Sequence, residues 1–453
     1  MITDKEILLA RHCISHALAC GASAARVSLN KSLSDTCTIL NGELDKLTHS
    51  ADRSIYIYLF VDGRYGTFST NRLEQEDLEK FIADAIDMTR MLAEDEARSL
   101  PASERTAKDA MTGKELGLYD ESIGTNDVDA RISKALTLSR WNRYGDTDGY
   151  RIISEECEYS ESYEDNYTAD SQGFEGRHAE TCFGTFAEVT IEDESGCKYS
   201  GYWWETSPHA KGLPDDCCTR AHDRAVRQIG PKKRRSGTYK MVVDRTCATR
   251  LVSPVLTALN ASSIQQKMSF LEGTQGKQVF PEQMSLMDLA RTHGCSGARL
   301  YDSEGVATKD APVIEKGVVK QYFVSTYMSA KTGLEATVED ISRPWLMPFI
   351  KGIDLSANEK EVSLEDILAH CSNGIYVTGF NGGNCNPVTG EYSFGIEGFA
   401  FSKGKITHPV REMLITGNLM ELWGNLIAAG SDARKCSRWQ IGSLAFENVS
   451  FSS

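Results

Sequence analysis

The chain has 453 residues, and its 64 acidic residues outnumber its 49 lysines and arginines to give a formal net charge of −15. This charge disfavours direct nucleic-acid binding, which relies on clustered lysine and arginine; the one compact basic run, 231–235, is typical of a solvated loop. The 13 cysteines lack any CxxC spacing, and the chain has neither a signal-peptide pattern nor an apolar stretch near ~20 residues, so we expect a cytoplasmic protein with reduced thiols and no membrane span.

Residues 1–93 are predicted to form a helix, an antiparallel meander and a second helix. Thr3 and Glu6 form a capping-box pattern at the start of the first helix. Asn41-Gly42 and Asp62-Gly63 are hairpin turn signals between short alternating segments. The expected strands are 25–29, 35–40, 43–50, 54–61 and 64–70, and the second helix has an apolar face of Phe81, Ile82, Ala85, Ile86 and Leu92.

Residues 94–230 are predicted to form a middle region. Its first part, 94–126, is polar and acidic and indicates a linker or a surface excursion. A helix over 129–140 then leads into a β-rich stretch over 150–206, and a further helix is expected over 217–229.

Residues 231–453 are predicted to form a β-rich domain with few helices, which makes the chain an α+β protein. We expect a strand over 240–243 and a helix over 246–259, followed by strands with glycine-rich turns. Asn418 and Glu421 indicate the start of a late helix that ends at Gly430. Its expected buried face is Leu419, Leu422, Trp423, Leu426 and Ile427.

Two groups of histidines and cysteines suggest metal chemistry only weakly. His12 and His16 are four residues apart on one helical face, a spacing that suits two imidazoles on one zinc ion. No glutamate lies between them, and a role at the surface or in packing is favoured. The other group has irregular spacings without a C-x2-C pair, which favours buried thiols and unrelated histidines. It comprises Cys157, His178, Cys182, Cys197, His209, Cys217 and Cys218.

The stretch 379–390 is rich in glycine and asparagine but lacks the GK[ST] ending of a phosphate loop and the GxGxxG pattern. It predicts a long turn or, alternatively, a place where another backbone approaches closely. Cys385 would be a nucleophile only if His370 or His408 folded beside it, which is the weaker interpretation.

Asp302, Glu304 and Asp310 are neighbouring carboxylates in the C-terminal half. Such a group suits a cation site or paired acids. A solvated turn before the next strand is the favoured interpretation.

Several blocks of the C-terminal half occur in a distinctive order and spacing. They are SFLEGTQGKQV at 269–279, LYDSEGVAT at 300–308, Lys316-Gly317 with Gln321-Tyr322, TGEYS at 389–393 with Gly398-Phe399, PVRE at 409–412 and TGNL at 416–419. Together they resemble the TldD/PmbA (TldE) family over about residues 220–450, and the N-terminal third resembles it in pattern only.

The resemblance implies one of two branches. TldD-like members resemble zinc peptidases with a His-Glu-x-x-x-His motif on a helix and a distant cysteine. The matching helix here, 248–258, reads ATRLVSPVLTA, and Val252, Ser253 and Thr257 form a degenerate metal-site helix without zinc ligands. Gln440-Ile441-Gly442 stands near the expected cysteine, and Cys436 is out of step with it. The resemblance therefore implies the PmbA/TldE branch, with no catalytic residue and no cofactor in this chain.

The expected function is that of a non-catalytic subunit of a TldD-type zinc metallopeptidase complex. The resemblance implies that zinc lies only in a TldD-like partner and that the complex acts on extended or unfolded peptides, in proteolysis, peptide maturation or indirect modulation of DNA gyrase. We expect the peptide to add as a strand to an exposed sheet edge. The candidate peptide contacts are Gly382, Gly383, Asn384, Asp302 and Glu304. Two alternatives stay open: a stand-alone peptide-binding homodimer, and an independent hydrolase with an unrecognised site.

Overall fold

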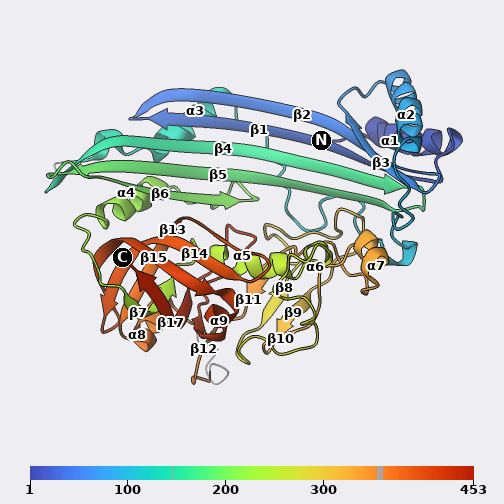
Figure 1. Ribbon diagram of the computed structural model, residues 1–453. Helices are drawn as coiled ribbons and strands as arrows, with labels where there is room; N and C mark the ends of the chain where they lie inside the picture. The colour runs from blue at the N-terminus through green and yellow to red at the C-terminus, as the bar shows by residue number, and fades with distance from the viewer. Residues whose placement is uncertain (146, 355–360) are drawn as a thin grey trace. The chain divides into compact units, whose positions relative to one another are not determined.

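The computed structural model describes residues 1–145, 147–354 and 361–453 (Figure 1). The chain divides into two compact units, each with its own core. The first unit comprises Met1–Arg227, Arg291–Thr308 and Ser329–Gly333, and the second comprises Gln228–Ala290, Lys309–Met328 and Leu334–Ser453.

The first unit is built on one antiparallel sheet with the strand order β3-β2-β1-β4-β5-β6. The strands are β1 Ala24–Leu40, β2 Glu43–Val61, β3 Arg64–Thr70, β4 Tyr150–Asp170, β5 Glu175–Asp193 and β6 Lys198–Ser207. Asn41-Gly42 and Asp62-Gly63 turn the chain with positive φ, as predicted. The prediction of separate strands over 25–40 and over 43–61 was wrong. Each range is one strand, because the β1–β2 ladder continues through polar residues such as Lys31 opposite Arg53.

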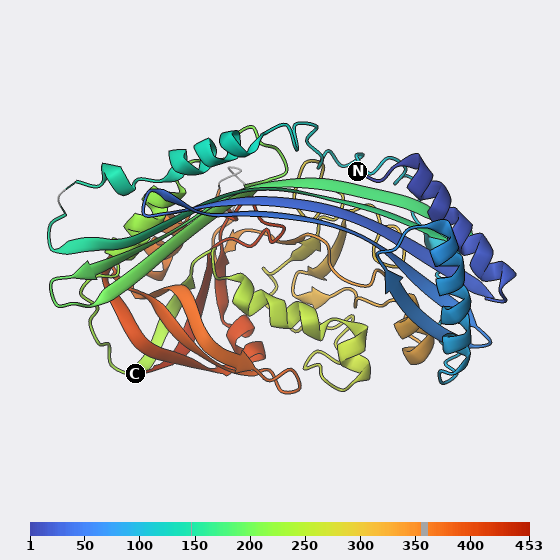
Figure 2. The ribbon, with the colours of Figure 1, turned by 90° about the horizontal axis from the view of Figure 1, so that it is seen from above.

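Two helices at one end of this sheet pack their apolar faces against its strands. They are α1 Asp4–Ala19 and α2 Gln75–Arg90, and they lie side by side (Figure 2). The predicted capping box is confirmed, because the Thr3 hydroxyl accepts from the Glu6 amide and the Glu6 carboxylate accepts from the Thr3 amide. Farther along the sheet pack α3 Val128–Leu138 and α4 Cys217–Val226, with short 3-10 turns at Ser103–Arg105 and Trp141–Arg143.

A closed barrel of five strands forms the centre of the second unit. Strand β7 Gly237–Val243 pairs in parallel with β13 Gly374–Cys385 and antiparallel with β17 Leu444–Ser452. Strands β14 Glu391–Ser402 and β15 Lys405–Asn418 complete the ring between β13 and β17. Strands β16 Leu426–Ala429 and β12 Phe349–Ile350 extend it from β17.

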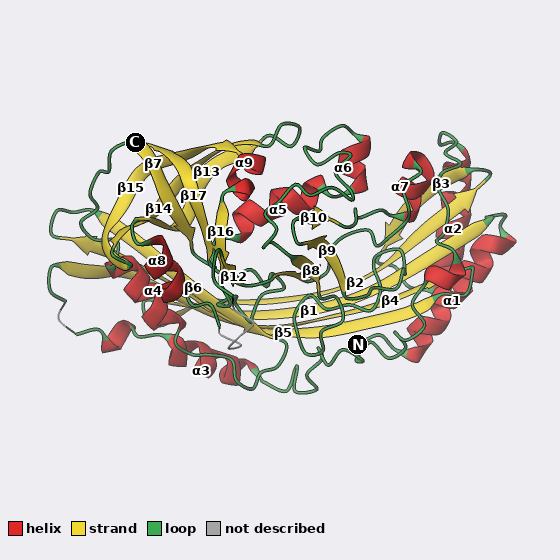
Figure 3. Cartoon of the chain, turned by 90° about the horizontal axis from the view of Figure 1, so that it is seen from below, coloured by secondary structure: helices red, strands yellow, loops and turns green. Residues whose placement is uncertain are grey.

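A four-stranded sheet and several helices complete the second unit. The sheet has the order β10-β9-β8-β11, with β8 Leu286–Asp288, β9 Ala311–Glu315, β10 Val318–Val319 and β11 Pro344–Leu346. Its helices are α5 Thr249–Ala258, α6 Ala261–Gln265, α8 Leu364–Cys371 and α9 Leu419–Gly424, whereas α7 Thr326–Thr332 is divided between the two units after Met328. Helix α9 packs against β15 and β17 (Figure 3).

The late helix is shorter than predicted. Asn418 caps α9 by accepting from the Met420 amide, but the helix ends at Gly424. Leu426 and Ile427, expected on its buried face, belong instead to β16, where Leu426 pairs with Phe446. Pairing with β17 therefore overrides an apolar spacing that also fits a helix.

The predicted α+β class is confirmed, with a helix–meander–helix start and a β-rich C-terminal region. The division at residues 93 and 230 remains a prediction. In the parts of the chain that the structure describes, no helix combines the length and apolar character needed to cross a bilayer.

Candidate functional site

The glycine-rich stretch forms a bulged hairpin rather than the predicted long turn. Residues up to Cys385 belong to β13 and residues from Glu391 belong to β14, so only 386–390 make the turn. The register slips between Asn381 and Asn384, and the two residues between them, Gly382 and Gly383, have φ of 62° and 73°. This is a β-bulge, which bends a strand and re-aims its backbone groups.

Two glycines of this hairpin lie against the backbone of the neighbouring strand, whereas the approach of a peptide backbone to this stretch remains a prediction. A Cβ on Gly383 would lie 1.9 Å from the carbonyl oxygen of Ser393 in β14. A Cβ on Gly398 would lie 2.0 Å from the carbonyl oxygen of Tyr376. The glycines thus let β13 and β14 approach where side chains would separate them.

One side of β13 lacks a partner strand over much of its length. Strand β7 pairs with β13 only from Ile375 to Val377, and the Val377 carbonyl then accepts from the Asp244 amide at 2.8 Å as the chain turns toward α5. Beyond that point, no strand in the described parts of the chain pairs with the side of residues 378–385 that faces away from β14. We call this side the outer edge of β13. Residues 381–384 of this edge are exposed, so it can pair with an added strand.

Helix α5 places an arginine against this edge. The Arg250 Nη2 atom donates to the Gly383 carbonyl oxygen at 2.9 Å, and the guanidinium carbon lies 5.1 Å from the centre of the Phe394 ring. A guanidinium has five donor hydrogens, so one bond to Gly383 leaves others to bind a ligand. Arg250 was not predicted as a site residue from the sequence, although its position three residues before Ser253 places it on the same helical face.

Helix α5 has an exposed face with two hydroxyl groups. Ser253 and Thr257 are exposed on the same side as Arg250, and the Thr257 hydroxyl donates to the Ser253 carbonyl at 3.0 Å. Val252 is buried in the core of the second unit. The exposed side of α5 therefore presents one guanidinium and two hydroxyl groups.

Asp302 and Glu304 lie in the first unit, whereas the Gly382–Asn384 segment lies in the second. Asp302 is buried, and its Oδ1 atom accepts from the backbone amides of Glu304 and Val306 at 2.9 Å each. These bonds shape the turn between two short bridging segments. A peptide contact at these two carboxylates remains a prediction.

Cys385 is far from both histidines that could activate it. It pairs with Tyr392, whereas His408 pairs with Ala400, so the two positions are separated by roughly 26 Å along β14 at ~3.3 Å per residue. His370 lies on α8, which precedes the opposite end of β13. Burial also raises the pKa of the Cys385 thiol, which reduces its thiolate fraction.

Among the described residues, two side-chain groups could hold a metal ion. One is Glu155 with Cys157 and Cys218, all buried, whose two Sγ atoms are 2.7 Å apart. The Glu155 carboxylate is already used, since it accepts from the Ser139 and Tyr144 hydroxyls at 2.6 Å each and from two backbone amides. This group is therefore better explained as a structural carboxylate beside buried thiols.

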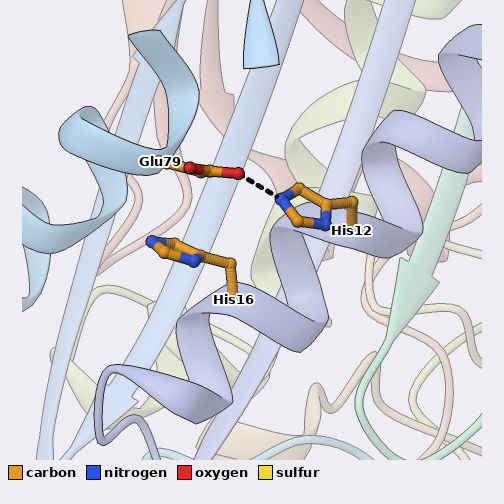
Figure 4. A group of neighbouring side chains, drawn as sticks. All are labelled: His12, His16 and Glu79. Atoms are coloured by element: carbon orange, nitrogen blue, oxygen red, sulfur yellow. Dashed lines mark hydrogen bonds and ion pairs between the residues drawn. The ribbon is translucent and has the colours of Figure 1, made fainter. Parts of the chain in front are cut away.

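The second group combines the predicted histidine pair with a glutamate from the neighbouring helix. His12 and His16 lie on α1, and Glu79 of α2 reaches them, with its Oε1 atom 2.7 Å from His12 Nε2 (Figure 4). Gln75 donates to the same carboxylate at 2.9 Å. The hydrogen bonds from Gln75 and His12 lower the pKa of the Glu79 carboxyl. The sequence offered only two histidines, and the fold adds the carboxylate of Glu79 to them.

Comparisons with known proteins place these features in a family. Models described as PmbA/TldA metallopeptidase domain 1, central domain and C-terminal domain match residues 25–89, 120–229 and 236–453. The metalloprotease PmbA of Escherichia coli O157:H7 is 25% identical over 94% of this chain and 92% of its own length. A homologue from Haemophilus influenzae is 24% identical over 90% and 88%.

Solved structures agree over the whole chain. A candidate modulator of DNA gyrase from Bacteroides thetaiotaomicron is 38% identical, with a TM-score of 0.93 and full coverage of both chains. TldE from Thermococcus kodakarensis has the same fold, with a TM-score of 0.79 at 16% identity over 98% of this chain and 100% of its own. The family resemblance of the C-terminal blocks is thereby confirmed, and it extends to the N-terminal half.

Proposed function

Because this chain belongs to the PmbA/TldD metallopeptidase family, we propose that it is the non-catalytic, peptide-holding subunit of a complex with a TldD-type zinc peptidase. The observation that carries this proposal is the outer edge of β13 beside an α5 face that presents Arg250, Ser253 and Thr257. A catalytic zinc ion needs three protein ligands, usually imidazoles and carboxylates, and an open position for water. A serine, a threonine and a buried valine at the motif positions do not supply them.

The outer edge of β13 supports the peptide-holding part of the proposal. An extended peptide can add to such an edge through main-chain hydrogen bonds, which select an unfolded chain with little regard to sequence. Each of the five barrel strands has a partner on both sides over part of its length, and the outer edge of β13 is a segment where this pairing stops. Gly382, Gly383 and Asn384 are then the contact residues on this chain, and Arg250 orients a peptide carbonyl or carboxylate.

Replacing Arg250 with alanine should weaken binding of an unfolded peptide by about tenfold, because one charge-assisted hydrogen bond is worth ~1.5 kcal/mol. Fluorescence anisotropy with a labelled peptide and the assembled complex measures this change. Stability should change little, since Arg250 is exposed. Arg151→Ala is the matched control, because it removes an exposed arginine of the first unit that pairs with Glu192 of the same unit. Equal peptide affinities of the two variants would show that Arg250 does not contribute to peptide binding.

The central test is peptide hydrolysis by this chain alone, by a TldD-type partner alone and by the two together. We expect chelator-sensitive cleavage only when the partner's His-Glu-x-x-x-His motif is present, and co-purification of both chains from the native cytoplasm. Chelator-sensitive cleavage by this chain alone would overturn the proposal. Peptide binding by a homodimer with no partner recovered would instead establish the stand-alone alternative. Any effect on DNA gyrase would be indirect, in keeping with the net charge of −15.

A further inference from the structure

The exposed helix pair at the start of the chain carries a set of metal-ligating side chains that the peptide-holding role does not use. From this geometry we propose that His12, His16 and Glu79 form a binding site for a transition-metal dication, with Zn²⁺ as the best match. The site lies wholly in the first compact unit. It is independent of α5 and of the proposed peptide edge.

The ligand atoms are already gathered. One potential ligand atom from each residue lies within 4.8 Å of the other two. Zinc bonds to nitrogen and oxygen are ~2.0–2.2 Å long, so two ligands of a tetrahedral ion are about 3.4 Å apart. Small rotations of three partly exposed side chains close that difference. Figure 4 shows both imidazoles extending from successive turns of α1 toward the Glu79 side chain.

The arrangement contains more than an ion pair requires. A surface ion pair with the Glu79 carboxylate requires only one imidazole, and His12 supplies it. Yet the His16 ring lies 6.0 Å from the His12 ring, centre to centre, and is inclined to it by 25°. Two imidazoles and a carboxylate are a common zinc ligand set.

Neighbouring groups suit the same interpretation. Gln75 donates to the Glu79 carboxylate, which is the kind of outer hydrogen bond that orients metal ligands. Cys20 Sγ lies 3.4 Å from His16 Nε2, which brings a soft ligand close to the same imidazole. His12 and Glu79 have side chains 38% and 36% exposed, so an ion can enter and keep water in an open position. Imidazole ligands favour Zn²⁺, Ni²⁺ or Cu²⁺ over Mg²⁺ and Ca²⁺.

The test is calorimetric titration of the full-length, reduced protein with Zn²⁺ at neutral pH, with Mg²⁺ as a comparison. We expect one saturable zinc site whose affinity falls by at least about 100-fold in His12→Ala, His16→Ala and Glu79→Gln, since even the loss of an outer partner costs 10–100-fold. His49→Ala is the matched control, because it removes an exposed histidine paired with Asp35 and should leave the affinity unchanged. Mg²⁺ should not bind at this site.

A second readout needs no variant. Because the ion would link α1 to α2, Zn²⁺ should slow amide hydrogen exchange in both helices of the wild-type protein and leave α8 unaffected. The Co²⁺ complex should show ligand-field absorption. A thiolate charge-transfer band should appear in addition only if Cys20 also binds the ion. Zinc affinity equal in all variants, which would indicate binding by other cysteines, would overturn the proposal. No saturable binding by the wild type would do the same.

Discussion

Replacing Gly383 with alanine is expected to destabilise the second unit by about 3 kcal/mol or more. The residue has a φ of 73°, which costs an alanine about 1–2 kcal/mol. Its new methyl group would also lie 1.9 Å from the Ser393 carbonyl oxygen, and the strand backbone cannot yield as a flexible side chain would. Such overpacking adds about 1–3 kcal/mol. The β13–β14 ladder must therefore separate locally or slip in register.

Gly382→Ala is the matched control for this change. Gly382 has a similar φ of 62°, but apart from its chain neighbours no heavy atom of the described residues lies within 4 Å of its added Cβ. It should therefore cost only about 1–2 kcal/mol. Hydrogen exchange over β13 and β14 measures the difference, with β1 and β2 of the first unit as an internal reference. Equal protection of the two variants would show that the bulge tolerates the methyl group and that the close approach does not limit the hairpin.

The Gly383→Ala substitution should also affect the proposed peptide site. The Gly383 carbonyl oxygen holds the Arg250 guanidinium at the outer edge of β13. If the bulge shifts, this contact and the edge geometry are lost together, so peptide binding should fall more in Gly383→Ala than in Gly382→Ala. Gly383 therefore allows β14 to approach closely and, in the proposed function, also contributes to the peptide contact.

Features set by neighbouring residues were predictable from the sequence. The start of α1 follows from Thr3 and Glu6, whose side chains satisfy each other's backbone amides. The turns at Asn41-Gly42 and Asp62-Gly63 follow from residues that tolerate positive φ. In each case the favourable interactions lie within four residues, so no knowledge of the tertiary fold was needed.

Features set by distant partners were not predictable in this way. Closure of the barrel depends on Val243 pairing with Leu444, about 200 residues later, and no local pattern indicates it. Leu426 fits a helical face equally well until its partner in β17 is known. The metal-ligand group has the same origin: the sequence showed two imidazoles, and Glu79 joined them only through the packing of α2 on α1.

Replacing Trp423 with alanine should destabilise the second unit by about 3–5 kcal/mol, the usual range for a large aromatic side chain in a core. Trp423 is fully buried on α9, and its ring meets those of Phe280 and Phe446 edge-on, with centres 6.5 and 5.5 Å away. Alanine would leave a cavity between α9 and β17. Leu414→Ala is the control, since Leu414 is 47% exposed in the same unit and should change stability by less than about 1 kcal/mol.

Trp423→Phe separates the volume of this side chain from its polarity. The indole Nε1–H is buried without a hydrogen-bond partner among the described residues, and such a donor costs about 1–3 kcal/mol to bury. Phenylalanine removes this cost while keeping most of the ring contacts, so we expect a loss of only about 1 kcal/mol. The free energies of unfolding in urea would rank the variants, and hydrogen exchange in β17 would show whether the loss of stability lies in the second unit. A phenylalanine variant as unstable as the alanine variant would mean that the indole N–H is satisfied by a buried water molecule, and that polarity at this position contributes to the core.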